Sequence, residues 1–178
     1  MKKILVALLI STVSFTALTG CTNKEDAKNN APNTQKTQNQ ESSDNIKIKS
    51  ESTQSLISTL ADLMGKEDKE VVEKLGKGIP VSDPVLSRQY ETNVLDENNK
   101  VYVNLDSGKV YDISILLNNN NFEEYEKKLT EIFGEKSSEE ENTLDSEGNG
   151  RRATIWNLEN GSKLSLIQVN KTFSINIK

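Results

Sequence analysis

The sequence KVYDISI at residues 109–115 alternates apolar and polar side chains, and KTFSINI at residues 171–177 repeats that alternation near the end of the chain. A period of two is typical of a strand with one buried face. Each segment puts an aromatic residue, Tyr111 or Phe173, on the same side as two isoleucines. We therefore predict two matching strands, each of which ends one half of the fold.

Two further strand candidates precede each of these segments. The first half offers strands at 86–95, 100–106 and 109–117, joined by segments 96–99 and 106–108 that carry the Asx and Gly residues of tight turns. The second half offers strands at 151–158, 162–169 and 171–177. Each half is thus expected to form a three-stranded antiparallel meander.

Apolar residues at helical spacing precede each group of strands. They occur at 56–64, where Gly65 ends the pattern, and again at 122–133. A short helix lies between the first helix and the first strands, with Asp68 as its expected N-cap and Gly76 as its end. Helices and strands therefore recur in the same order.

This recurrence predicts an α+β fold built by internal duplication. Residues 53–178 would form one domain of two repeats, 53–117 and 118–178, each with a helix and a three-stranded antiparallel meander. The helices would pack on one face of the sheet. The strand residues expected to face them are Val101, Val103, Leu105, Tyr111, Ile113, Ile115, Leu164, Leu166, Phe173, Ile175 and Ile177.

The opposite face of the sheet is the candidate binding surface, because it mixes apolar side chains with hydrogen-bonding ones. Its residues are Tyr102, Asn104, Asp112, Ser114, Ser165, Ile167, Ser174 and Asn176. The predicted partner-binding residues are Tyr102, Asn104, Asp112, Ser165 and Ile167. The alternative is that this face is the solvated side of an antiparallel sheet.

Trp156 is the sole tryptophan of the chain. Tryptophan is enriched at binding hot spots, but the alternation around it places it on the same side as Leu158. A buried position in the core is the simpler interpretation.

The segment DSEGNG at residues 145–150 resembles a calcium loop, with oxygen ligands Asp145, Glu147 and Asn149 at alternate positions and a glycine at the sixth. Trp156 stands where such a loop needs a bidentate glutamate, and a strand follows instead of a helix. We therefore predict no metal site and treat the segment as a solvated turn.

The N-terminus carries an export pattern. Lys2 and Lys3 precede an apolar run over residues 4–18, which is shorter than the roughly 20 apolar residues that a membrane span needs. The run ends in LTGC at 18–21, which resembles a bacterial lipobox. The resemblance implies a signal peptide at 1–20, removed before Cys21, a diacylglyceryl thioether on the Cys21 sulfur, and a fatty acyl group such as palmitate on its amine. A non-cleaved anchor is the alternative.

Residues 22–52 are rich in Asn, Gln, Lys, Glu, Ser and Thr. Such a segment buries too little apolar surface to offset its ordering entropy, so residues 21–52 are predicted to be a lipidated, disordered tether. Two or more acyl chains hold a protein stably. The expected location is the extracytoplasmic face of the cell membrane.

Composition excludes several chemistries. The chain has no histidine, and its one cysteine is assigned to lipid, so neither a Cys/His zinc site nor a nucleophile paired with histidine can form. The net charge of −5 becomes −7 once Lys2 and Lys3 are removed, which disfavours nucleic acid. We predict no enzymatic activity and no cofactor beyond the covalent lipid.

The segment LMGKEDKEVVEKLG at 63–76 is similar to the helix signature of small envelope and secreted proteins, a group that includes the beta-lactamase inhibitor protein and the small lipoprotein of the outer-membrane assembly machine. The resemblance implies a curved sheet with helices on one face and a binding surface on the other. The abundance of Lys, Asn and Ile resembles that of AT-rich Gram-positive proteins.

Two functions remain open at this point. The first is a membrane-anchored protein-binding module, acting as an inhibitor or as an envelope assembly or accessory factor with an envelope or extracellular protein as partner. The second is an accessory lipoprotein that senses a small ligand or ion, as in nutrient uptake or spore germination. A sizeable apolar pocket would favour the second, and a continuous open sheet face the first.

Overall fold

The structure is a computed structural model that describes residues 46–118 and 121–178. All of these residues belong to one compact unit, Gln40–Lys178. The predicted signal peptide, the lipidation site Cys21 and the predicted tether as far as residue 45 lie outside the described residues.

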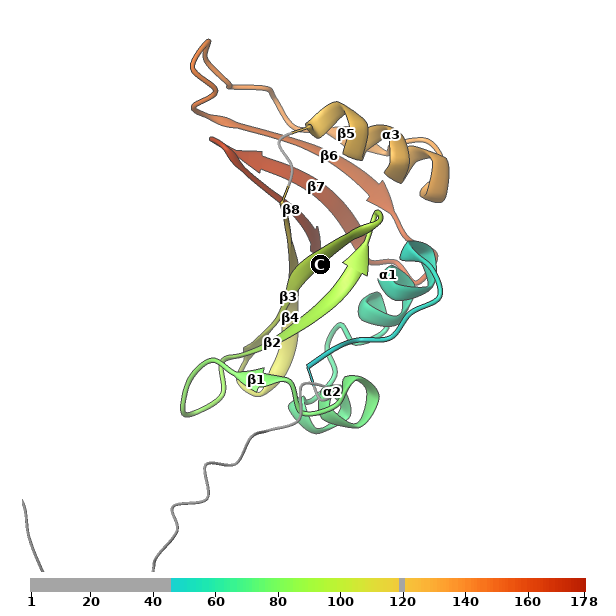
Figure 1. The fold of residues 1–178 in the computed structure, drawn as a ribbon, viewed down its shortest axis with the longest axis vertical. Coiled ribbons are helices and arrows are strands. Elements are labelled where there is room, and N and C mark those ends of the chain that lie inside the picture. Colours follow the sequence, from blue (N-terminus) through green and yellow to red (C-terminus); the bar gives the residue numbers. More distant parts are fainter. Residues whose placement is uncertain (1–45, 119–120) are drawn as a thin grey trace, which may run out of the picture. The chain divides into compact units, whose positions relative to one another are not determined.

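The described residues form three helices and one eight-stranded sheet in which every pair of neighbouring strands is antiparallel (Figure 1). The strand order is β1-β2-β3-β4-β8-β7-β6-β5. In chain order the elements are α1 (Thr53–Ala61), α2 (Asp68–Leu75), β1 (Ile79–Pro80), β2 (Ser87–Val94), β3 (Glu97–Asp106), β4 (Lys109–Leu117), α3 (Phe122–Phe133), β5 (Ser138–Glu139), β6 (Arg151–Asn157), β7 (Lys163–Val169) and β8 (Thr172–Ile177).

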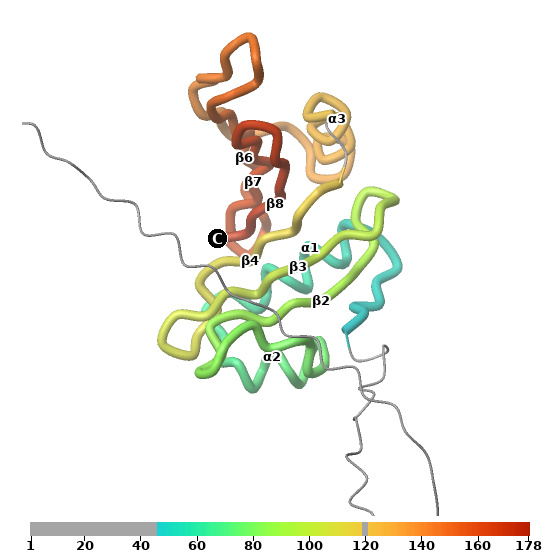
Figure 2. The backbone as a smooth tube through the Cα atoms, turned by 60° about the vertical axis from the view of Figure 1, so that its left-hand side comes forward, coloured from blue at the N-terminus to red at the C-terminus, as the bar shows by residue number. Residues whose placement is uncertain are grey.

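The prediction of an α+β fold made of duplicated three-stranded meanders is wrong. The two groups of strands are parts of one sheet, because β4 pairs directly with β8: Ile113 lies opposite Ile177 and Ile115 opposite Ile175. Figure 2 shows this junction, where β4 lies beside β8. Each meander alone would leave an unpaired strand edge, and joining the two edges satisfies both sets of backbone groups. The sheet also has two outer strands of two residues, β1 and β5, too short for any alternation to reveal.

All three helices contact the same face of the sheet. On α2, Asp68 accepts hydrogen bonds from Arg88 Nε and Nη2 at 2.5 and 2.7 Å. On α3, Glu126 accepts a bond of 2.7 Å from Thr154 Oγ1 on β6. On α1, Thr53 Oγ1 accepts a bond of 3.0 Å from the backbone N–H of Leu95. The hydrophobic core fills the layer between these helices and the sheet.

Trp156 belongs to this core, which confirms the interpretation made from its alternation. Its side chain has no exposed surface, and its Nε1 donates a hydrogen bond of 3.1 Å to the Gly134 carbonyl just after α3. A buried indole N–H needs such a partner. The bond ties β6 to the end of α3.

The cap of α2 differs from the expectation. Glu67, not Asp68, is the N-cap, and it forms a capping box with Glu70, whose carboxylate accepts the Glu67 N–H at 3.0 Å. That hydrogen bond, from the backbone of Glu67, is the main cause that lowers the pKa of Glu70. Asp68 is thereby left to bind Arg88.

A β-bulge in β4 corrects another expectation. Asn104 on β3 pairs with Asp112, but the next residue, Leu105, pairs with Val110, so Tyr111 is an extra residue without a partner. Val110 takes the buried position opposite Leu105, and Tyr111 is 56% exposed. All other strand residues predicted to face the helices are buried.

The segment before α1 is part of the sheet edge. Lys47 forms a parallel bridge with Glu91 on β2, and two backbone hydrogen bonds, Ile48 N to Glu91 O and Glu91 N to Ile46 O, measure 2.9 and 2.8 Å. These residues fall within the stretch assigned to the tether from sequence. They cover the part of the β2 edge that β1 leaves free, as exposed strand edges generally require.

Candidate functional site

The face of the sheet that points away from the helices is called the open face below. Because side chains alternate along each strand, the register assigns residues to it. One row of cross-strand neighbours runs from Tyr102 on β3 through Ser114 and Asn176 to Ser165 on β7. Every residue predicted to bind a partner shares this face: Tyr102, Asn104, Asp112, Ser165 and Ile167.

A hydrogen-bonded network occupies the middle of the open face. The Asp112 carboxylate accepts bonds from Asn104 Nδ2 at 2.8 Å, Ser114 Oγ at 2.9 Å and Asn176 Nδ2 at 3.3 Å. Asn176 Nδ2 also donates to Ser114 Oγ at 2.9 Å, and Ser174 Oγ donates to Asn176 Oδ1 at 2.8 Å. These contacts join β3, β4 and β8 and hold the side chains in fixed orientations.

Apolar side chains surround this network. Leu116 on β4 is 38% exposed and lies between Lys100 and Ser174 in the register. At the margins of the same face, Ile79, Val81 and Val169 are 43, 56 and 43% exposed. A mixture of apolar contact area and oriented polar groups is typical of a protein-binding surface.

We call the middle of the open face the central patch. Its residues are Tyr102, Asn104, Asp112, Ser114, Leu116, Ser165, Ile167, Ser174 and Asn176.

Charge is nearly absent from the central patch. Asp112 is its one charged residue, although charged residues make up 28% of the chain. Lys100 shares the face and lies directly opposite Leu116 at the margin of the patch, and Lys109 and Lys163 lie toward the strand ends. The solvated side of a sheet has no need to exclude charge, whereas the centres of interfaces are depleted of it. The distribution therefore favours a binding surface.

Sequence reasoning missed four exposed apolar residues of the open face: Ile79, Val81, Leu116 and Val169. The alternation that placed Ser114 also places Leu116 on this face, so its signal was present. Ile79 and Val81 gave no signal, because β1 has only two residues. Val169 ends its strand next to a turn, where alternation is least informative.

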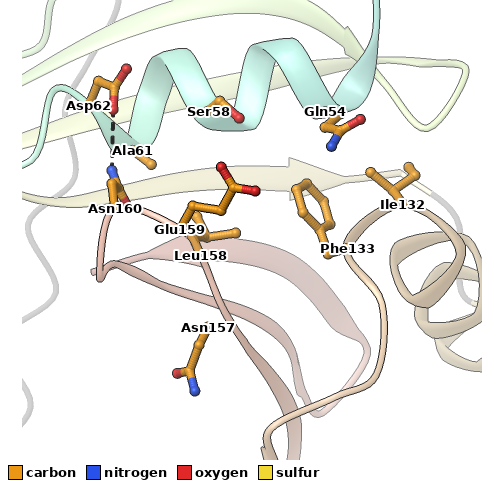
Figure 3. Close-up of a pocket in the computed structure, with 10 residues that line it drawn as sticks. All are labelled: Gln54, Ser58, Ala61, Asp62, Ile132, Phe133, Asn157, Leu158, Glu159 and Asn160. Atoms are coloured by element: carbon orange, nitrogen blue, oxygen red, sulfur yellow. Dashed lines mark hydrogen bonds between the residues drawn. The ribbon is translucent and has the colours of Figure 1, made fainter.

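A groove on the helix side of the sheet is the other candidate (Figure 3). It has a volume of about 410 Å³ and lies between α1, the end of α3 and the turn after β6. Asp62 and Glu159 bring carboxylates to it, and Asp62 accepts a bond of 3.3 Å from Asn160 Nδ2. Both carboxylates are exposed to water, so the groove lacks the desolvated titratable groups that mark catalytic sites.

The turn at 145–150 uses its possible calcium ligands internally. Asp145 Oδ1 accepts the backbone N–H groups of Glu147 and Asn149 at 2.9 and 2.8 Å, and Asp145 Oδ2 accepts Asn149 Nδ2 at 3.1 Å. The bonds from Asn149 are the largest cause of the lowered pKa of Asp145. Within residues 46–118 and 121–178, no three acidic, His or Cys side chains gather as a metal site would need.

Comparison with protein-family models, curated proteins and solved structures finds no match to this chain. The lipobox at 18–21 and the resemblance of residues 63–76 therefore remain predictions from the sequence. In the part of the chain that the structure describes, no helix has the length and apolar character to cross a membrane.

Proposed function

We propose that this chain is a membrane-anchored, extracytoplasmic lipoprotein whose folded part is a non-catalytic protein-binding module, acting as an inhibitor or an envelope assembly factor. The partner docks on the open face of the sheet. The lipid on Cys21 keeps the module close to its membrane.

The observation that carries this proposal is the composition of the central patch. It combines Tyr102, Leu116 and Ile167 with a hydrogen-bonded network, and a single charge. The network holds its polar side chains in place before any partner arrives, which reduces the entropy lost on binding. Aromatic and aliphatic side chains that exclude water supply most of the affinity at such surfaces.

Sensing of a small ligand is supported less well. An apolar pocket would favour it, whereas the groove of Figure 3 is bordered by exposed carboxylates and amides. The open face is also continuous across the strands that carry the central patch.

Photocrosslinking in native membranes tests the proposal. A photoreactive residue replaces Ser165, and the crosslinked protein and its contact segment are identified by mass spectrometry. Ile167→Asp puts a charge into the central patch and should lower the crosslink yield at least about tenfold, as loss of a hot spot does. Thermal melts establish that each variant is folded.

Ile132→Asp is the matched control, because Ile132 is also half-buried but lies in the groove on the helix side. A crosslink that survives Ile167→Asp would refute docking on the open face. A separate variant, Cys21→Ala, should move the protein from the membrane to the soluble fraction. Retention of this variant in the membrane would contradict the lipid anchor but not the binding face.

A further inference from the structure

The Asp112 carboxylate is nearly buried and makes no ion pair among the described residues, although Lys178 follows Ile177 at the end of β8, next to Asp112 in the register. Asp112 is 7% exposed. Within residues 46–118 and 121–178, no lysine or arginine lies within ion-pair distance of it. The groups that contact it are the neutral side chains of Asn104, Ser114 and Asn176.

Neutral donors only partly offset the cost of taking a carboxylate out of water. The carboxylate could have faced water at a strand end, as Asp106 does at the turn between β3 and β4. Instead, three hydrogen bonds fix its orientation within the central patch, which has no other charged residue. A group placed in this way is complementary to a positive charge that arrives with the partner.

The two oxygens of Asp112 are not used equally. Oδ2 accepts two short bonds, from Asn104 and Ser114, at 2.8 and 2.9 Å. Oδ1 accepts one long bond of 3.3 Å, from an Asn176 amide that also donates to Ser114. Since an ionised carboxylate offers about four acceptor positions, Oδ1 keeps capacity for a further donor. The strongest donor for that position is a cation.

We infer that the partner inserts a basic side chain, an arginine, into the central patch and pairs it with Asp112. This inference rests on the proposed function and names the chemistry of the partner's docking surface. Arginine fits better than lysine because its guanidinium is weakly hydrated and stacks on aromatic rings. Tyr102, which lies opposite Ser114 in the neighbouring row, supplies a ring on the same face.

The charge also disfavours a second copy of this chain as the occupant. Two open faces related by a twofold axis through the central patch would bring two Asp112 carboxylates together without a cation between them. A partner with an arginine among apolar side chains has no such cost.

The photocrosslinking experiment at Ser165 tests this inference when two further variants are added. Asp112→Asn removes the negative charge at nearly constant shape and should lower the crosslink yield at least about tenfold, as loss of a buried charge partner does. Glu91→Gln is the matched control, since it removes a carboxylate at the edge of the same face, and it should change the yield less than about twofold. The crosslinked segment of the partner should contain an arginine.

The partner side gives a second measurement that does not depend on whether Asp112→Asn folds. Replacing the partner's arginine with methionine should cause the same loss, and combining it with Asp112→Asn should cause no further loss. If Ile167→Asp abolishes the crosslink while Asp112→Asn and the partner's methionine variant leave it intact, the partner docks on the open face but the basic side chain is refuted. If Ile167→Asp has no effect, the proposed function itself fails. A crosslink only to a second copy of this chain would overturn the inference.

Discussion

Replacing Tyr111 or Ile113 with alanine tests the β-bulge in β4. The two residues are two positions apart, and simple alternation gives them the same environment. The structure separates them: Ile113 has no exposed surface, whereas Tyr111 is the extra residue of the bulge and is 56% exposed. Comparing the two alanine variants therefore distinguishes the observed register, with its bulge, from an unbroken strand.

The magnitudes follow from burial. Ile113→Ala leaves a cavity between Val103 and Ile177, and such a change in a core costs about 2–5 kcal/mol. Tyr111→Ala removes a side chain that is mostly in water already, so its cost should stay below about 1 kcal/mol, mainly from the lower strand propensity of alanine. The expected difference in the free energy of unfolding is at least about 1 kcal/mol.

The assay is urea unfolding of the chain from residue 22 onward, followed by the fluorescence of Trp156. This residue is fully buried in the folded state, so its emission should shift to the red on unfolding. Equal slopes with urea concentration would show that the two variants expose similar surface. A loss for Tyr111→Ala as large as that for Ile113→Ala would refute the bulge and restore the unbroken alternation.

Three further predictions concern the fold. Gly78→Ala should be more destabilising than Gly108→Ala in urea unfolding. A Cβ at Gly78 would lie 2.6 Å from the Tyr90 ring, whereas one at Gly108 would meet no atom within 4 Å. Both glycines have positive φ, so the backbone strain is common to the two variants and equal losses of stability would contradict this packing. Burial raises the pKa of Tyr90 to about 12, so the stability that its neutral form supplies is complete below the unfolded value near 10 and is lost as pH rises through 12. Ultraviolet titration should show a late-ionising component that Tyr90→Phe diminishes, and an unchanged titration curve would contradict the burial of this hydroxyl. A chain that starts at residue 51 lacks the three hydrogen bonds that join Ile46 and Ile48 to Glu91 and Thr92 on β2, so it should be about 2–3 kcal/mol less stable than a chain that starts at residue 22. It should also aggregate more through the uncovered edge, and equal stability would show that the pairing of residues 46–48 is dispensable.

Local sequence patterns were enough to place most of the secondary structure and the two faces of the sheet. Alternation along 100–106 and 171–177 identified buried residues such as Val103 and Ile175, because a strand repeats every two residues wherever it lies. The same rule assigned Asn104, Asp112 and Ser165 to one face without any knowledge of their neighbours.

The candidate site was only partly accessible from the sequence. Its residue types and their common face could be predicted. The hydrogen bonds from Asn104 and Asn176 to Asp112 could not, because they link three different strands, β3, β4 and β8. Asn176 is 64 residues away from Asp112 in the chain. No periodicity within one strand encodes such a contact.

By itself, the sequence determined which strand side chains are buried wherever alternation is unbroken, where the helices and the longer strands lie, and which chemistries a chain without histidine excludes. Only the tertiary structure decided that β4 and β8 join two groups of strands into one sheet, that a bulge turns Tyr111 out of the core, and that Asp112 has no ion-pair partner among the described residues. The physical reason is that burial follows the polarity of each side chain, which can be read residue by residue. Strand pairing uses backbone groups that are the same in nearly every residue, so it depends on which edges meet in space.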